Sequence, residues 1–325
     1  MPKSDSVSDV KVYRVWTTRF GRSNLVGRAI DYLSFYPLAF LTLLRVVHKN
    51  DVIIAKTDPP LVSVIALMAA KLKRAKLVNW LQDIFPEVAE VLGVLKSKRL
   101  VSLIKWLRNI SLRQASMNVV LGKRMMERIC AQGVDHSKVR IIPNWADGNV
   151  VKPVSKIDNG LRKAWRLDDK FVVGYSGNMG RAHEFNTLIH AIKRLRNEEN
   201  IIFLFIGGGA GKAAIEIAVK RFNLKNCVFK PYQSRTKLSE GLSVPDLHFL
   251  SLNPDLEGLI VPSKIYGIVA AGRPSLFIGD LDGEISMMLD KYGCGTSFGI
   301  GDDKGVAGYI KMKAKNAESK KSDYD

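Results

Sequence analysis

The stretch Val172–His183 (VVGYSGNMGRAH) decides how this chain folds. An apolar, strand-like run ends in glycines, and an apolar pattern with helical spacing starts shortly afterwards at Phe185. Glycines at the end of a strand let the backbone approach a ligand closely, and the free N–H groups of a following helix favour an anion. The stretch therefore predicts a strand, a turn suited to a phosphate and a helix; an ordinary tight turn is the alternative.

Strand-like apolar runs alternate with helical patterns on both sides of this stretch. They lie at 51–56, 76–81, 117–121 and 139–142 in the first half, and at 171–176, 201–206, 227–230, 246–250 and 275–278 in the second. Such alternation favours parallel sheets covered by helices. We therefore predict an α/β chain of two Rossmann-like domains, residues 1–150 and 151–325, whose parallel sheets face a ligand-binding cleft.

The composition fits a folded protein with an anionic partner. Hydrophobic residues make up 46% and charged residues 25% of the 325 residues, which excludes disordered and collagen-like chains. Lys and Arg (50) outnumber Asp and Glu (31), and residues 1–150 alone hold 24 basic against 11 acidic residues. Nucleic acid, a phosphorylated substrate or an acidic membrane surface would each be attracted by this charge.

The sequence predicts no metal centre, disulfide framework or membrane span. The three cysteines and five histidines show no metal-ligand spacing, which favours a reducing cytoplasm. The polar N-terminus lacks the apolar core of a signal peptide. The most apolar stretches, Tyr36–Val47 and Pro59–Ala70, are about a dozen residues, whereas a spanning helix needs about 20.

A second glycine-rich segment, Ile206–Lys212 (IGGGAGK), follows another strand-like run. Its spacing does not match a P-loop. Gly207 and Gly208 nevertheless form a turn against which a nucleotide base or ribose can rest, and a purely structural turn is the alternative.

A lysine lies where a helix is expected to begin. In Glu257–Gly267 (EGLIVPSKIYG), Pro262 and Ser263 are typical of a helix start, which places Lys264 in the first turn. A cation there opposes the helix dipole, so its presence makes sense if Lys264 faces an anionic ligand. A solvated lysine is the alternative.

In the first half, Asp83 comes just after the strand-like run that ends at Leu81. A carboxylate at that end of a parallel strand faces the cleft, where it can accept a substrate proton or hold a hydroxyl. Helix capping is the alternative, because Asp is a strong N-cap residue.

Together these segments resemble the family-4 retaining glycosyltransferases, most closely the bacterial branch that builds capsule, O-antigen and other exopolysaccharides on lipid carriers. The resemblance runs from about Val10 to about Gly301. The segments that carry it are Thr57–Pro60 (TDPP), Val78–Asp83 (VNWLQD) with Pro86 and Glu87, Ile142–Trp145 (IPNW), Gly177–His183 (GNMGRAH), Pro262–Tyr266 (PSKIY) and Ala270–Pro274 (AAGRP).

The resemblance implies the two-domain GT-B architecture, with the acceptor on the first domain, a nucleotide diphosphate sugar on the second, and no cofactor or required metal. Glu257 matches the acidic residue near the donor sugar, and Asp83 lies at the acceptor-side acidic position. These two are the catalytic candidates. The donor-binding candidates are Gly177, Asn178, Gly180, Arg181, His183, Gly207, Gly208, Ser263, Lys264 and Glu284.

The reaction expected from the resemblance is transfer of a hexose or N-acetylhexosamine to a lipid-linked saccharide, with retention, in cell-surface polysaccharide biosynthesis. Residues 71–113 hold 10 basic against 3 acidic residues, which suits an anionic membrane surface. We therefore expect a cytoplasmic protein associated peripherally with the inner face of the plasma membrane; solvated faces of core helices are the alternative. No nucleic-acid partner is expected, because no readout module accompanies the basic residues. The oligomeric state is left open.

The chain also departs from the family pattern. Gly267 stands where many relatives have a ribose-binding Glu. The chain opens at Val10–Trp16, inside the family's first domain and without its usual first strand and glycine-rich loop, and it ends in the polar run Lys311–Asp325 where relatives continue through helices. A truncated, non-catalytic relative that binds nucleotide or a partner is therefore an alternative function, and a sugar-nucleotide epimerase is another.

Overall fold

The computed structural model describes residues 4–7, 9–21 and 25–322. Its internal contacts divide the chain into two compact units, Met1–Pro143 and Asn144–Asp325, which are described separately. The division lies a few residues before the predicted boundary at 150/151.

The first unit contains a four-stranded parallel sheet in the order β3-β4-β5-β6. A separate antiparallel hairpin, β1 (Ser4–Val7) and β2 (Val10–Tyr13), precedes it. The sheet strands are β3 (Val52–Lys56), β4 (Lys76–Trp80), β5 (Met117–Val120) and β6 (Val139–Ile141). The helices are α1 (Leu25–Val46), α2 (Val62–Lys73), α3 (Glu87–Val91), α4 (Lys98–Gln114) and α5 (Lys123–Cys130), with the 3-10 turn η1 (His136–Lys138).

Small apolar residues bring α2 close to the sheet. Ala66, Ala69 and Ala70 of α2 are buried in one cluster with Ile53 of β3 and Leu77 of β4. Strand β3 alternates exposed and buried residues, as expected for a strand that packs on helices with one face only.

Helix α1 is longer than its uninterrupted apolar run. Pro37 lies inside it. Its segment Val26–Val46 is long and apolar enough to cross a membrane, judged by length and composition, and is the one such helix among the described residues. The sequence analysis counted only the run from Tyr36 and so predicted no span. The structure shows a helix with one face packed in the α2 cluster, through Phe40, Leu43 and Leu44, and with few of its residues fully buried.

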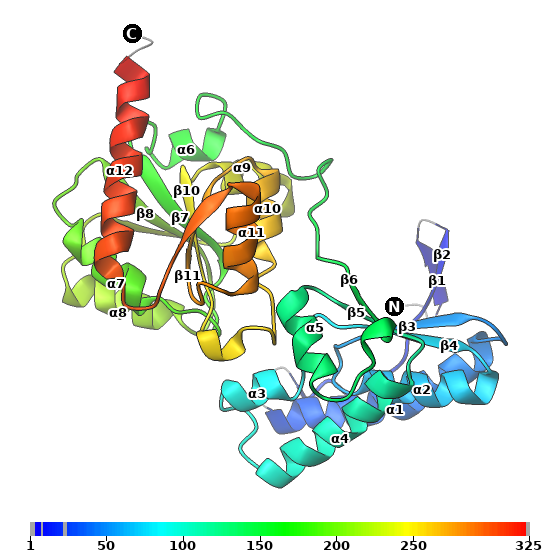
Figure 1. Cartoon of the computed structure of the whole chain (residues 1–325). Coiled ribbons are helices and arrows are strands. Elements are labelled where there is room, and N and C mark those ends of the chain that lie inside the picture. Colours follow the sequence, from blue (N-terminus) through cyan, green and yellow to red (C-terminus); the bar gives the residue numbers. More distant parts are fainter. Residues whose placement is uncertain (1–3, 8, 22–24, 323–325) are drawn as a thin grey trace. The chain divides into compact units, whose positions relative to one another are not determined.

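The second unit contains a six-stranded parallel sheet in the order β12-β11-β10-β7-β8-β9. Its strands are β7 (Phe171–Asn178), β8 (Ile201–Gly208), β9 (Cys227–Lys230), β10 (Leu247–Ser251), β11 (Ser275–Ile278) and β12 (Gly295–Phe298). Its helices are α6 (Gly160–Ala164), α7 (Asn186–Arg194), α8 (Lys212–Arg221), α9 (Leu238–Ser243), α10 (Lys264–Ala270), α11 (Glu284–Tyr292) and α12 (Asp303–Ser322), with the 3-10 turns η2 (Arg235–Lys237) and η3 (Pro254–Leu256). In Figure 1, α7, α8 and α12 lie on one side of this sheet, and α9 and α10 on the other. The two parallel α/β sheets confirm the predicted fold class.

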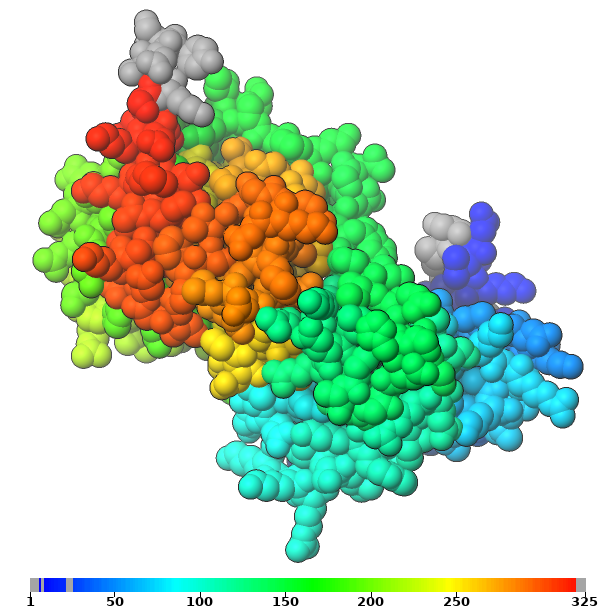
Figure 2. Space-filling model, in the orientation of Figure 1, coloured from blue at the N-terminus to red at the C-terminus, as the bar shows by residue number. Residues whose placement is uncertain are grey.

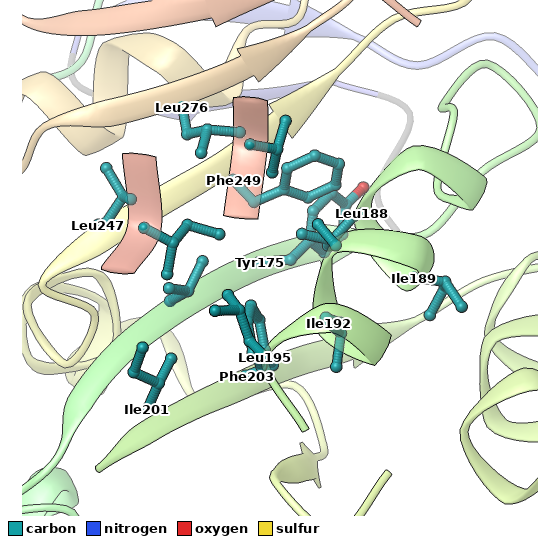
Figure 3. Packing of buried hydrophobic residues seen from close by; sticks show 14 of the residues in the cluster. Tyr175, Leu188, Ile189, Ile192, Leu195, Ile201, Phe203, Leu247, Phe249 and Leu276 are labelled. Atoms are coloured by element: carbon teal, nitrogen blue, oxygen red, sulfur yellow. The ribbon is translucent and has the colours of Figure 1, made fainter. Parts of the chain in front are cut away.

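Strand β7 lies in the middle of this sheet and forms the centre of its core. The inward-facing Phe171, Val173 and Tyr175 pack against α7 and the neighbouring strands, and Figure 3 shows Tyr175 beside Phe249 and Leu188. Because β7 pairs with β8 on one side and with β10 on the other, the strand order reverses at its carboxyl end. That is the usual ligand position in open α/β sheets.

The sequence analysis missed the last two elements of the unit. Strand β12 pairs with β11, and the polar run that starts at Lys311 continues α12 as far as Ser322. Val306, Ala307, Ile310 and Ala314 of this helix are buried in the core, and Tyr309 and Ala317 pack against it while partly buried. Figure 2 shows α12 on the outside of the second unit. Lysines dominate the rest of the helix, which hides its helical period.

Candidate functional site

The glycine turn at the carboxyl end of β7, residues 177–180, is built for close approach. Gly177 has φ +124°, and a Cβ added there would lie 2.9 Å from Cε of Lys264. Its partner across the sheet is Gly207, with φ +125°, where an added Cβ would lie 2.3 Å from the carbonyl oxygen of Gly177. Both positions therefore require glycine, because a side chain would collide with the lysine or with the neighbouring strand.

The ammonium of Lys264 sits over this turn. Its Nζ donates to the carbonyl oxygen of Asn178 (3.1 Å), lies 3.3 Å from Nε2 of His183, and donates to the hydroxyl of Tyr175. It also lies 3.9 Å from the centre of the Tyr175 ring. Lys264 is the first residue of α10, so the predicted position in a first turn is confirmed. The solvated-lysine alternative is wrong, because the ammonium points into the protein.

All three acceptors of this ammonium are neutral. The Tyr175 hydroxyl donates to the carbonyl oxygen of Asn178 (2.6 Å), and burial raises the pKa of Tyr175. Nδ1 of His183 is 2.7 Å from the carbonyl oxygen of Ser251. Because a carbonyl only accepts, Nδ1 carries the proton and Nε2 offers its lone pair to Lys264. Burial, reinforced by the Lys264 charge, lowers the pKa of His183 to about 4.

The Lys264 charge has no acidic partner within the residues that the structure describes. Burial lowers the pKa of Lys264 from 10.5 to about 7. A cation held by neutral acceptors alone is poorly compensated for the water it has lost. The site therefore favours an incoming negative charge.

The other donor-binding candidates of this unit lie around this point in three groups. Gly180, Arg181 and His183 line a cavity of about 350 Å³ together with the first turns of α7 and α8. Gly208 lies under the ring of Tyr232, whose hydroxyl donates to the Gly208 carbonyl oxygen (3.3 Å). Ser263, which precedes Lys264 in the chain, is exposed, and so is Asn178 at the glycine turn.

The side chain of Glu257 contacts the backbone of Glu284. Oε1 of Glu257 accepts the backbone N–H of Glu284 (2.9 Å) in the first turn of α11. A Cβ on the intervening Gly283 would lie 2.6 Å from the other carboxylate oxygen. Burial raises the pKa of Glu257, which is 7% exposed. Glu257 thus fixes the start of α11, a structural role that the sequence analysis did not foresee.

Asp83 belongs to the first unit. It lines a cavity of about 30 Å³ at the carboxyl ends of β3 and β4, with Thr57, Asn79 and Trp80 among its neighbours. Burial raises the pKa of Asp83, although a hydrogen bond with the Thr57 side chain opposes the effect. No side chain caps the following helix α3, where Pro86 is the N-cap, so the capping alternative is wrong.

The sequence analysis missed two residues of the site around Lys264 in the second unit. Tyr175 and Tyr232 touch the glycine turn, but the first looks like any core aromatic of a strand and the second lies in a polar loop. Among the described residues, no group of three His, Cys, Asp or Glu could hold a metal ion.

Comparison with known proteins identifies the class. A Glycosyl transferase 4-like domain matches residues 2–145. The probable glycosyltransferase WbjE of Pseudomonas aeruginosa is 29% identical over 300 residues, which are 90% of this chain and 74% of that protein. The putative colanic acid biosynthesis glycosyl transferase WcaI of Escherichia coli K12 is 27% identical over 230 residues, 69% of this chain and 56% of that protein.

Solved structures agree on the fold. Anabaena Alr3699/HepE in complex with UDP-glucose has a TM-score of 0.69 at 17% identity, covering 91% of this chain and 75% of that one. WaaG, a glycosyltransferase of lipopolysaccharide biosynthesis, has a TM-score of 0.69 at 12% identity, covering 96% and 79%. The fold is thus that of the GT-B glycosyltransferases. These relatives place the chain among the glycosyltransferases of polysaccharide biosynthesis, and its residues 2–145 match the Glycosyl transferase 4-like domain.

Proposed function

We propose that the second unit binds the diphosphate of a nucleotide sugar at Lys264, and that the protein transfers the hexose or N-acetylhexosamine to a lipid-linked saccharide with retention. The observation that carries the proposal is the half-buried Lys264 ammonium, held over a glycine turn by three neutral acceptors. A diphosphate supplies the missing negative partner. The related fold of Alr3699/HepE, described in complex with UDP-glucose, supports this choice of donor.

The same arrangement suits the chemistry of transfer. When the bond between sugar and diphosphate breaks, negative charge builds up on the departing diphosphate, and a cation already in place stabilises it. Lys264 and the exposed Arg181 supply that positive charge from the protein itself. We therefore propose that the reaction needs no metal or cofactor.

The two acidic candidates have different proposed tasks. Glu257 is held rigidly by the α11 backbone, which suits a residue that orients the donor sugar. Asp83 has a raised pKa in a cavity that Trp80 also lines, which suits a group that holds an acceptor hydroxyl and takes its proton.

We further propose that the first unit lies on an anionic membrane surface at the cytoplasmic face. Helix α1 exposes Val26, Leu33 and Leu41, and the neighbouring α2 exposes Leu72. The last turn of α2 carries Lys71 and Lys73. An apolar helix face beside lysines is typical of a helix that lies in the membrane interface. The packing of its other face on α2 favours this interfacial position over a span.

Donor binding is tested by calorimetry with UDP-, GDP- and TDP-sugars, using Lys264→Ala and, as control, Lys220→Ala on the exposed face of α8. We expect one donor class to bind, Lys264→Ala to lose most of the affinity, and the control to bind normally. Binding of no donor would contradict the proposal, whereas binding without turnover on any lipid-linked acceptor would support the non-catalytic alternative.

Membrane association is tested by co-sedimentation with phosphatidylglycerol and phosphatidylcholine vesicles. We expect binding to the anionic vesicles only, and loss of binding in Leu33→Glu but not in Ile217→Glu, which changes an equally exposed apolar residue on α8. Equal binding by both variants would contradict the assignment of this surface.

A further inference from the structure

Tyr175 occupies a core position that phenylalanine would fill equally well. It is 1% exposed, and its ring packs edge-on against Phe185 (5.1 Å between centres) and beside Phe249 (6.1 Å). Figure 3 shows the ring in the middle of the core, with the hydroxyl oxygen at its outer end. A hydroxyl is costly in such a place unless it has a partner, so its presence calls for a reason.

The contacts of the hydroxyl supply that reason. It donates its proton to the carbonyl oxygen of Asn178, so its lone pairs remain for the Lys264 ammonium. The centre of the same ring lies 3.9 Å from Nζ of Lys264. One side chain therefore meets the ammonium in two ways, through a lone pair and through the ring face.

Because of the groups around Lys264, its protonation depends strongly on the contact with Tyr175. The titratable groups that face the ammonium are Tyr175 from β7 and His183 from the loop after it, and both are neutral. The third acceptor is the backbone of Asn178. Since these neutral acceptors stabilise the positive charge, loss of one of them destabilises the protonated lysine and lowers its pKa.

We propose that Tyr175 is a positioning residue for Lys264: its hydroxyl and ring face hold the lysine at the glycine turn, protonated and ready to bind the donor diphosphate. This inference rests on the proposed function in naming the ligand. Its structural part, the effect of Tyr175 on Lys264, holds for the free protein as well.

The test removes only the hydroxyl. In Tyr175→Phe the ring and its packing remain, and Tyr309→Phe, which alters a tyrosine of α12 packed on Phe298, is the control. The pKa of Lys264 is measured in both free proteins by NMR of the lysine side chains, with Lys264→Arg to assign the signal. We expect the pKa to fall by about one unit in Tyr175→Phe, because a hydrogen bond to a charged group is lost, and to stay unchanged in the control.

The binding of UDP then links this change to the ligand. With a fall of about one unit, the affinity of Tyr175→Phe relative to the unaltered protein drops about fivefold at pH 7 and about ninefold at pH 8, and the two are nearly equal at pH 5. Titration of UDP itself cancels in this ratio. In a Lys264→Ala background, Tyr175→Phe is expected to have no further effect.

Each outcome is decisive. An unchanged Lys264 pKa in a folded Tyr175→Phe protein overturns the inference, and so does an affinity loss that persists at pH 5 or in the Lys264→Ala background. If none of UDP, GDP and TDP binds the unaltered protein while the pKa shift is seen, the proposed function is wrong and the positioning role stands.

Discussion

Replacing Lys264 by methionine is expected to stabilise the unliganded protein while abolishing donor binding. The methionine keeps the length and apolar stem of the side chain and removes the ammonium. Burial holds the pKa of Lys264 at about 7, against 10.5 in an unfolded chain. Folding therefore disfavours the protonated lysine, and the pKa difference corresponds to an upper bound of about 5 kcal/mol.

The sign and the pH range follow from proton linkage. Below pH 7 the lysine is protonated in both states, and the full cost of burying the charge opposes folding. Between pH 7 and 10.5 the unfolded chain binds more protons than the folded one, so stability rises with pH as this cost disappears. Lys264→Met removes the cost, and its advantage should be about 2 to 4 kcal/mol at pH 6 and fade by about pH 10.

Urea denaturation at pH 6, 8 and 10 measures this difference, with Lys220→Met as the control for removal of an exposed lysine. Calorimetry with the donor on the same samples shows the loss of binding. The reasoning is refuted if Lys264→Met is less stable than the unaltered protein at pH 6, or if its advantage does not change with pH. A stabilising change that destroys the ligand site is typical of groups kept for function rather than for folding.

Three further predictions concern the glycine turn and the acidic residues. Gly207→Ala should lower the free energy of unfolding by about 2 kcal/mol or more, since its Cβ would overlap a backbone carbonyl at a positive φ, whereas Gly299→Ala, with open space around it, should change it little in the same denaturation assay. Glu257→Ala should cost about 1 kcal/mol through loss of the cap on the Glu284 N–H, while Glu257→Gln keeps an acceptor oxygen there; transfer assays on the stable Gln variant then report the role of the charge. Asp83→Asn should leave the unfolding transition unchanged and lower the transfer rate by about 100-fold or more, and an unaffected rate would rule out Asp83 as the proton acceptor. In the unaltered protein, the transfer rate should fall at acidic pH with a midpoint above pH 3.8, because burial raises the pKa of Asp83.

Much of the fold could be predicted from local patterns. The strand-like runs that end near Ser176, Ile206 and Leu250 became β7, β8 and β10, because buried parallel strands are written as continuous apolar runs. Elements with few buried positions were not predictable in this way. The second half of helix α12 is rich in lysine and other polar residues, and β12 shows neither a clear apolar run nor a strict alternation.

The sequence by itself also determined which residues form the site: glycines at the ends of two neighbouring strands, and a lysine at the start of a helix. Tertiary structure alone decided that Lys264 turns inward onto Tyr175, which lies 89 positions away in the chain, and that Glu257 holds the start of α11. Spacing along the chain encodes which face of an element is apolar. The acceptors that meet one ammonium depend instead on the strand order, which sets the end of β7 beside the loop that leads into α10, and no local pattern records that order.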